Sequence, residues 1–89
     1  MIETEKEKIL HVRINKATEV VWEGEALSVS SRNAKGAFDI LGMHSNFISL
    51  VRNDPIKIIQ VNGTVDTYNF KQSVLFVNNN RVKIFSNIE

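Results

Sequence analysis

The chain has 89 residues, of which 43% are hydrophobic and 24% are charged. This is the composition of an ordinary globular protein, and it excludes an intrinsically disordered chain. The 11 basic residues balance 10 acidic ones, which gives a formal net charge of +1. Nucleic acids and anionic membranes bind proteins with a basic excess, so the balance argues against both as main partners. The absence of cysteine excludes disulfides, thiolate metal sites and cysteine nucleophiles.

Residues 1–8 are polar and charged, and we expect them to form a flexible N-terminal segment. They lack the apolar stretch of a secretory signal. No apolar run in the chain approaches the length of a membrane span. We therefore expect residues 9–89 to form a single domain that is soluble and cytosolic, or held at a membrane only through a partner.

Hydrophobic residues recur mainly with a period of two, which is typical of β-strands. This alternation predicts strands over residues 10–14, 27–30, 64–70 and 81–85. In the first of them, Leu10, Val12 and Ile14 share one face. Residues 74–77 form a continuous apolar run, so we expect both faces of that strand to be covered. Residues 44–52 fit a helical turn or a strand, and we favour a strand.

Turn-forming residues separate these runs. Asn62-Gly63 suits a two-residue type I′ hairpin, because both turn positions need positive φ. Residues 33–36 indicate a loop, residues 53–55 a turn and residues 78–80 a tight connection rich in Asn. Many short strands punctuated in this way predict an all-β sandwich or barrel. The 4 glycines are scattered, which excludes a phosphate-binding loop.

The candidates for catalysis and ligation are weak. His44 has Asp39 and Ser45 nearby in the sequence, but a catalytic triad is defined by geometry in space, and we interpret His44 as a loop histidine. His11 lies on the polar face of the first predicted strand, and 2 histidines without cysteine supply too few ligands for a metal site. Asn62-Gly63-Thr64 matches a glycosylation sequon, but the hairpin explains the same residues.

The aromatic side chains allow two interpretations. Trp22 and Tyr68 could join a stacking platform for single strands, but such platforms accompany a basic groove that the charge balance does not favour. We expect most aromatic residues to pack in the core, while Trp22 fits the core and an interface equally well. The residues alone leave open a protein-binding module and a small binder of sugars or oligonucleotides, with a hydrolase a distant third.

One segment is more specific than composition. Residues 36–44, GAFDILGMH, resemble the signature loop of the ATP synthase epsilon subunit, with matches at Gly36, Phe38, Ile40, Leu41 and His44. Residues 13–25 are similar to the family's first two strands, and residues 74–85 are similar to its closing hairpin. The resemblance covers residues 9–86 and rests on the order and spacing of these motifs together.

The signature segment also departs from the family pattern. Ala37 replaces an acidic residue, Asp39 stands where the family has Gly, and Gly42 stands where it has Pro. Asn46 replaces a frequent second Pro, and Gln72-Ser73 replaces paired glycines. The missing acid at Ala37 weakens the expected electrostatic contact with the c-ring, although Asp39 could supply a displaced charge. A divergent subunit and a diverged paralogue both explain these departures.

The resemblance implies a β-sandwich or flattened barrel of about ten short strands. It implies a non-catalytic central-stalk subunit, without a cofactor, that links the gamma subunit to the c-ring and couples proton or sodium flow to ATP synthesis. We expect a monomer outside the complex, with no nucleic-acid partner and no direct membrane insertion. The expected location is the cytoplasmic side of the cell (inner) membrane, where the synthase holds the chain peripherally.

The resemblance also implies the interaction residues. It assigns the c-ring contact to a loop formed by Gly36, Ala37, Phe38, Asp39, Ile40, Leu41, Gly42 and Met43. It places His44 near the gamma contact, with Phe47 packing behind it. Typical members continue into a C-terminal helical hairpin that inhibits ATP hydrolysis, so either a short form or removal of that hairpin is implied.

Three other functions remain as alternatives. A stand-alone β-sandwich adaptor need not keep Gly36, Ile40, Leu41 and His44 together. A carbohydrate or single-strand binder predicts an exposed row of aromatic side chains. An enzyme predicts a concave pocket in which a carboxylate lies within hydrogen-bond reach of His44, and we expect no such pocket.

Overall fold

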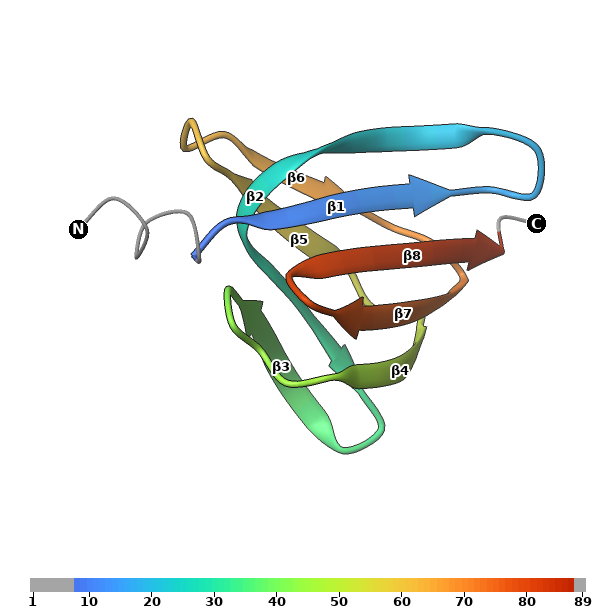
Figure 1. Ribbon diagram of the computed structural model, residues 1–89. Coiled ribbons are helices and arrows are strands. Elements are labelled where there is room, and N and C mark those ends of the chain that lie inside the picture. The colour runs from blue at the N-terminus through green and yellow to red at the C-terminus, as the bar shows by residue number, and fades with distance from the viewer. Residues whose placement is uncertain (1–7, 88–89) are drawn as a thin grey trace.

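The computed structural model describes residues 8–87, which form eight β-strands joined by short connections (Figure 1). The strands are β1 Leu10–Asn15, β2 Val20–Asn33, β3 Gly36–Leu41, β4 Phe47–Arg52, β5 Ile56–Gln60, β6 Val65–Tyr68, β7 Gln72–Asn78 and β8 Arg81–Asn87. The predicted all-β class is confirmed. The strands are fewer than the resemblance implies, because residues 20–33 form one strand of 14 residues. Within residues 8–87 there is no helix that could span a membrane.

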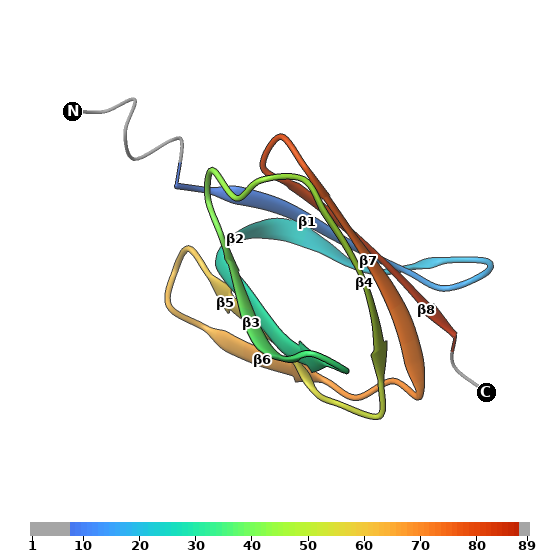
Figure 2. The ribbon, with the colours of Figure 1, turned by 90° about the horizontal axis from the view of Figure 1, so that it is seen from below.

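Seven of the strands form one sheet in the order β4-β7-β8-β1-β2-β5-β6. The eighth strand, β3, belongs to the same sheet but pairs only with β2. Along one edge of β2, β1 pairs with the first half and β3 with the second, while β5 pairs on the other edge. Figure 2 shows the sheet curled around its interior, with β4, β7 and β8 opposite β3, β5 and β6. Two walls that face each other across a shared interior make a β-sandwich, as predicted.

A bulge in β2 makes this curl possible. The register of β2 against β5 shifts between Ala26 and Ser28. Ala26, Ser28 and Val29 are all buried, whereas Leu27 is exposed. The simple alternation predicted for residues 27–30 is therefore wrong, because the bulge places Leu27 and Ser28 on the same, outer side of the sheet. Ser28 lies opposite Leu41, whereas Val29 lies opposite the buried Ile40 on the inner face. Bulges of this kind bend a strand and increase its twist.

The core lies between the two walls and is built from the inner faces of the strands. The predicted face Leu10, Val12 and Ile14 is fully buried, which confirms the period-two interpretation of β1. The other buried hydrophobic residues are Ala26, Val29, Ile40, Val51, Ile56, Ile58, Leu75, Val77, Val82 and Ile84. Most of these side chains are β-branched, which suits a pleated sheet surface. Trp22, Tyr68 and Phe70 pack against this core at its margin.

One expected core segment is only half covered. In β7, Leu75 and Val77 are buried, but Phe76 between them is 39% exposed. The prediction that both faces of residues 74–77 are covered is therefore wrong. The outer face of β7 has no layer packed on it among the described residues, since the sheet curls toward its other side.

The turns follow the Asn and Gly positions. Asn79 and Asn80 both have positive φ (52° and 61°), which makes the β7–β8 connection a type I′ turn. Asn53 also adopts positive φ, as a turn there requires. The two-residue hairpin expected at Asn62-Gly63 is wrong: residues 61–64 connect β5 to β6, and only Gly63 has positive φ. There the Asn62 side chain accepts a hydrogen bond from the Thr64 amide instead.

Asn80 joins three parts of the chain at one end of the sandwich. Its carbonyl oxygen accepts a hydrogen bond from the amide of His11 at 2.8 Å. Its side-chain Oδ1 accepts one from the amide of Met43 at 2.7 Å. The β7–β8 turn thereby positions both the start of β1 and the β3–β4 connection. Met43 itself has positive φ, so the connection is held in a sparsely populated conformation.

Replacement of Gly24 by alanine should displace Trp22. A Cβ at Gly24 would lie 2.7 Å from Cζ2 of the indole, closer than van der Waals contact allows. We expect Gly24→Ala to lower the free energy of unfolding by about 1–3 kcal/mol and to shift the emission of the only tryptophan. Urea denaturation followed by fluorescence measures both effects. Glu25→Ala, at an exposed neighbour, is the control, and an unchanged spectrum and midpoint in Gly24→Ala would refute the packing.

Substitutions at Asn80 should separate its two roles. Asn80→Gly tolerates positive φ but loses the acceptor for Met43, whereas Asn80→Asp keeps an acceptor oxygen. Because a hydrogen bond contributes about 1 kcal/mol, we expect the Met43 amide to exchange roughly fivefold faster in Asn80→Gly. Asn80→Asp should exchange as wild type does. Amide exchange by NMR tests this, and equal rates in all three proteins would contradict the proposed link.

Candidate protein-interaction site

The segment expected to be a loop is mostly a strand. Gly36–Leu41 forms β3, which pairs antiparallel with residues 28–33 of β2. The turn before it is short: the Asn33 side chain accepts a hydrogen bond from the Lys35 amide at 2.9 Å, and Gly36 takes φ of 127°. The loop prediction is therefore wrong for residues 36–41, and the connection to β4 begins only at Gly42.

The pleat of β3 divides the predicted contact residues between two faces. Ala37, Asp39 and Leu41 point outward and are exposed, and Met43 in the following connection is 68% exposed. Ile40 is fully buried, and Gly36, Phe38 and Gly42 are partly buried. A partner that meets this strand can therefore reach only the first set, which we call the β3 outer row: Ala37, Asp39, Leu41 and Met43.

Asp39 is engaged on the outer surface of the sheet. Its Oδ1 accepts a hydrogen bond from the hydroxyl of Ser30, directly opposite on β2, at 2.6 Å. No hydrogen bond connects Asp39 with His44 within the described residues. The ring of His44 instead lies with Nδ1 2.7 Å from the carbonyl oxygen of Ser45. The arrangement gives His44 no carboxylate partner of the kind that hydrolytic catalysis uses.

Three predicted site residues meet at the seam between β3 and β4. The rings of Phe38 and Phe47 have centroids 5.2 Å apart, and His44 meets Phe47 edge-on at 5.5 Å. These are favourable aromatic geometries. β3 and β4 share no ladder, so side chains close the sheet here. A hydrogen bond from Asn33 Nδ2 to Ser49 Oγ, at 2.9 Å, joins β2 to β4 beside the aromatic contact.

The seam changes the interpretation of Phe38, His44 and Phe47. All three are partly buried, and Phe38 and Phe47 pack against the core. These three side chains therefore hold β3 and β4 together and contribute only part of their own area to the exposed surface there. The expectation that Phe47 packs behind His44 agrees with their edge-on contact, while the gamma contact itself stays a prediction.

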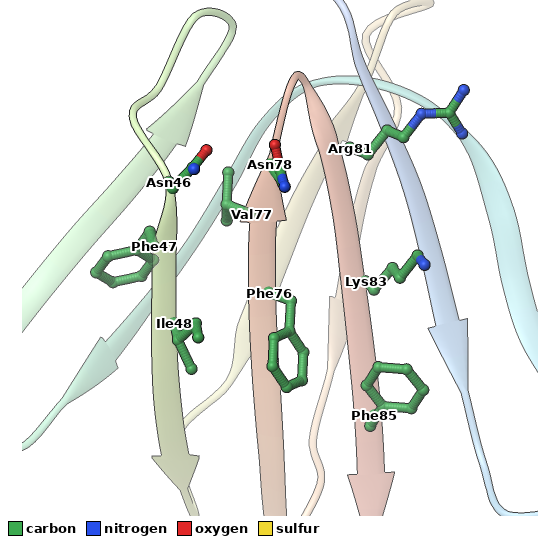
Figure 3. A pocket seen from close by; sticks show the side chains of 9 residues that line it. All are labelled: Asn46, Phe47, Ile48, Phe76, Val77, Asn78, Arg81, Lys83 and Phe85. Atoms are coloured by element: carbon green, nitrogen blue, oxygen red, sulfur yellow. The ribbon is translucent and has the colours of Figure 1, made fainter.

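The sequence did not predict an exposed apolar surface that lies on the wall formed by β4, β7 and β8. Ile48, Phe76 and Phe85 are 69%, 39% and 47% exposed and lie side by side on the outer face of β4, β7 and β8 (Figure 3). They line a shallow trough of about 440 Å³, with Arg81 and Lys83 beside it. The continuous apolar run of residues 74–77 hinted at such a surface. Sequence alone, however, does not show which face of a strand is covered.

The remaining candidates have structural roles. His11 Nε2 lies 2.8 Å from Glu23 Oε2, and this hydrogen bond lowers the pKa of the Glu23 carboxyl. Trp22 packs against the core, which favours the core interpretation over an interface anchor. Residues 8–87 contain no group of three or more side chains arranged to hold a metal ion.

Solved structures similar to the chain include chains of mitochondrial ATP synthases. One match is a chain in the Euglena gracilis enzyme, in a structure of OSCP, F1 and the c-ring, with a TM-score of 0.81 and 15% identity over 90% of this chain and 51% of that one. Another is a chain in the Tetrahymena thermophila central stalk and c-ring, with a TM-score of 0.71 and 10% identity over 90% and 63%. At these identities the likeness shows the fold alone.

The family assignment comes from the sequence itself. This chain spans about half of the Euglena chain and less than two thirds of the Tetrahymena one. No curated protein matched the sequence. Residues 9–88 match the family described as ATP synthase, Delta/Epsilon chain, beta-sandwich domain. That match covers nearly the whole chain and agrees with the curled eight-stranded sheet, so the chain belongs to the delta/epsilon β-sandwich family of ATP synthase.

Proposed function

We propose that the chain is a non-catalytic central-stalk subunit that links the gamma subunit to the c-ring of an ATP synthase. The observation that carries this proposal is the family match over residues 9–88. The similar structures are assemblies with a c-ring in both cases and a central stalk in one, which supports the same assembly for this chain. Coupling of proton or sodium flow to ATP synthesis would follow from that position.

A linking subunit needs stiffness and separate docking surfaces rather than a reactive pocket. The sheet is continuous from β4 to β6, and its open side is closed by the Phe38–Phe47 contact. Ladder hydrogen bonds and close packing resist deformation, so a force applied at one wall reaches the other. Coupling by rigid contact requires no group with a special pKa.

The β3 outer row is our proposed c-ring contact. Leu41 and Met43 supply exposed apolar side chains, and Asp39 supplies a carboxylate near the position where the family carries its acid. Exposed apolar side chains with a charged one beside them fit the apolar centre and polar rim of a protein interface. His44, supported by Phe47, would lie near the gamma contact.

The assembly would hold the chain peripherally on the cytoplasmic side of the cell (inner) membrane. Neither direct insertion nor a nucleic-acid partner is proposed. Outside the complex we propose a monomer.

Co-purification tests the proposal as a whole. The tagged chain is co-expressed with the synthase genes of its own genome and recovered after mild detergent extraction. We expect gamma and c subunits to be recovered together with the chain, and the tag alone to recover neither. A folded chain recovered without gamma and without c subunits would contradict the proposal and favour a stand-alone adaptor.

A variant of the β3 outer row tests the ring contact. The double substitution Asp39→Lys and Leu41→Lys reverses one charge and adds another at exposed positions, so the fold should persist. We expect recovery of c subunits to fall at least about tenfold while gamma binding is kept. Val65→Lys, at an exposed position of β6, is the matched control. Full ring recovery, or loss of the β-sheet circular dichroism spectrum, would contradict this assignment.

A further inference from the structure

The turn of residues 61–64, between β5 and β6, carries a motif that the proposed function does not use. It contains the dipeptide Asn62-Gly63, and all of its residues are exposed. The backbone nitrogen that follows an asparagine can attack the side-chain amide carbon, which closes a succinimide ring and releases ammonia. Glycine at the following position has no side chain that shields this nitrogen. The motif therefore places an electrophile and a nucleophile side by side in an exposed turn.

The electrophile, the side-chain amide of Asn62, is held in a defined orientation. Its Oδ1 accepts a hydrogen bond from the Thr64 amide at 2.9 Å, which makes an Asx turn. Among residues 8–87, nothing accepts a hydrogen bond from its Nδ2. Negative charge develops on Oδ1 when Cγ is attacked, and a donor already aimed at that oxygen stabilises this charge. The leaving nitrogen is meanwhile open to water.

The nucleophile, the backbone nitrogen of Gly63, is partly engaged. Gly63 takes φ of 93°, and its amide donates a hydrogen bond to the Gln60 carbonyl at 2.9 Å. This bond must break before the nitrogen can attack, which slows the reaction by roughly fivefold. A Cβ added at Gly63 would meet no heavy atom within 4 Å, so the residue has open space beside it. Water can therefore replace Gln60 as the partner and receive the amide proton.

Asn33 offers an internal comparison, because it forms the same Asx turn. Its side-chain oxygen accepts a hydrogen bond from the Lys35 amide, also at 2.9 Å. The residue that follows it is Ala34, whose methyl group shields the backbone nitrogen. Asn33 Nδ2 also donates to Ser49 Oγ at 2.9 Å, which ties the leaving nitrogen to β4. Asn62 therefore differs from Asn33 in both the access to its nucleophile and the freedom of its leaving group.

We propose that Asn62 is a self-modification site, at which the folded chain converts asparagine to aspartate and isoaspartate. The bond between Gly63 N and Asn62 Cγ forms and the bond from Cγ to Nδ2 breaks. The proton lost by the Gly63 amide is balanced by the proton that the leaving nitrogen takes up as ammonia. Water then opens the succinimide at either carbonyl. The sum of the steps is hydrolysis of the amide by one water, and it requires no oxidant, metal or enzyme.

The isoaspartate product should loosen the edge of the sheet. β6 pairs with β5 alone, and the Gln60 amide donates to the Thr64 carbonyl at 2.8 Å where the two strands meet the turn. Isoaspartate adds a carbon to the main chain inside this turn and so shifts one strand against the other. Aspartate keeps both the chain length and the acceptor for the Thr64 amide. The inference is independent of the central-stalk function, because the turn lies outside the β3 outer row.

Mass spectrometry of the aged protein tests the proposal. The purified full chain is kept at neutral pH and body temperature, and peptide maps follow the conversion of each asparagine. We expect Asn62 to convert at least about tenfold faster than Asn33, whose leaving nitrogen is hydrogen-bonded and whose nucleophile is shielded. Methyl transfer by an isoaspartyl methyltransferase should detect isoaspartate in the same peptide. Asn62→Gln, with a longer side chain, is the negative control.

Two substitutions at Thr64 test the role of the turn. Thr64→Pro removes the amide donor to Asn62 Oδ1, whereas Thr64→Ser keeps it. We expect the folded Thr64→Pro chain to convert roughly fivefold more slowly than wild type, and Thr64→Ser to convert as wild type does. Both variants should convert at equal rates in urea, because the turn is absent there. Circular dichroism confirms that each variant is folded before ageing.

Amide exchange tests the effect on the sheet. The isoaspartate form is separated by chromatography and compared with Asn62→Asp, which carries the same charge on an unaltered main chain. We expect the amides of β6 to exchange faster in the isoaspartate form. Equal exchange in the two proteins would contradict the loosening of β6.

Three outcomes would overturn the proposal. Conversion at Asn62 no faster than at Asn33 would show that the exposed motif is not reactive. Isoaspartate that forms in urea but not in the folded chain would show that the fold protects Asn62. Equal rates in folded Thr64→Pro and Thr64→Ser would remove the Asx turn from the reaction. The first two are measured on the unaltered chain and hold even if Thr64→Pro does not fold. None involves gamma or c-ring recovery, so failure here leaves the central-stalk function standing.

Discussion

The bulge in β2 between Ala26 and Ser28 is the constraint on which the shape of the domain depends. One strand of 14 residues pairs first with β1, then bends at the bulge and pairs with β3 and β5. The sheet can therefore curl back on itself and enclose a core that a flat sheet would leave half open. The aromatic contact of Phe38 with Phe47 then closes the side where no ladder forms.

The curl also separates two exposed surfaces of the domain. The β3 outer row lies on one wall, and the exposed apolar surface of Ile48, Phe76 and Phe85 lies on the other, with the seam between them. His44 and Phe47 belong to the seam, which explains why residues expected to form a contact are partly buried. A stiff body with two distinct surfaces is what a subunit that transmits rotation needs, and it requires no pocket chemistry.

Local pattern predicted much of this fold. Alternation identified the inner face of β1, and the Asn-rich turn before Arg81 follows from the tolerance of Asn for positive φ. The β3 strand was missed because resemblance to a family loop outweighed its own alternation over residues 36–41. The exposed apolar surface of Ile48, Phe76 and Phe85 was missed for another reason. An apolar run such as residues 74–77 carries no information about which side of the strand a neighbouring wall covers. That depends on the long-range pairing of β7 with β4 and on the direction in which the sheet curls.

Binding to gamma is the most direct consequence of the proposed place in the rotor. The decisive measurement is a calorimetric titration of the full chain with the gamma subunit from the same genome. We predict a saturable complex of one chain per gamma. A chain that is folded by circular dichroism but gives no binding heat at several temperatures, and does not co-elute with gamma, would contradict it.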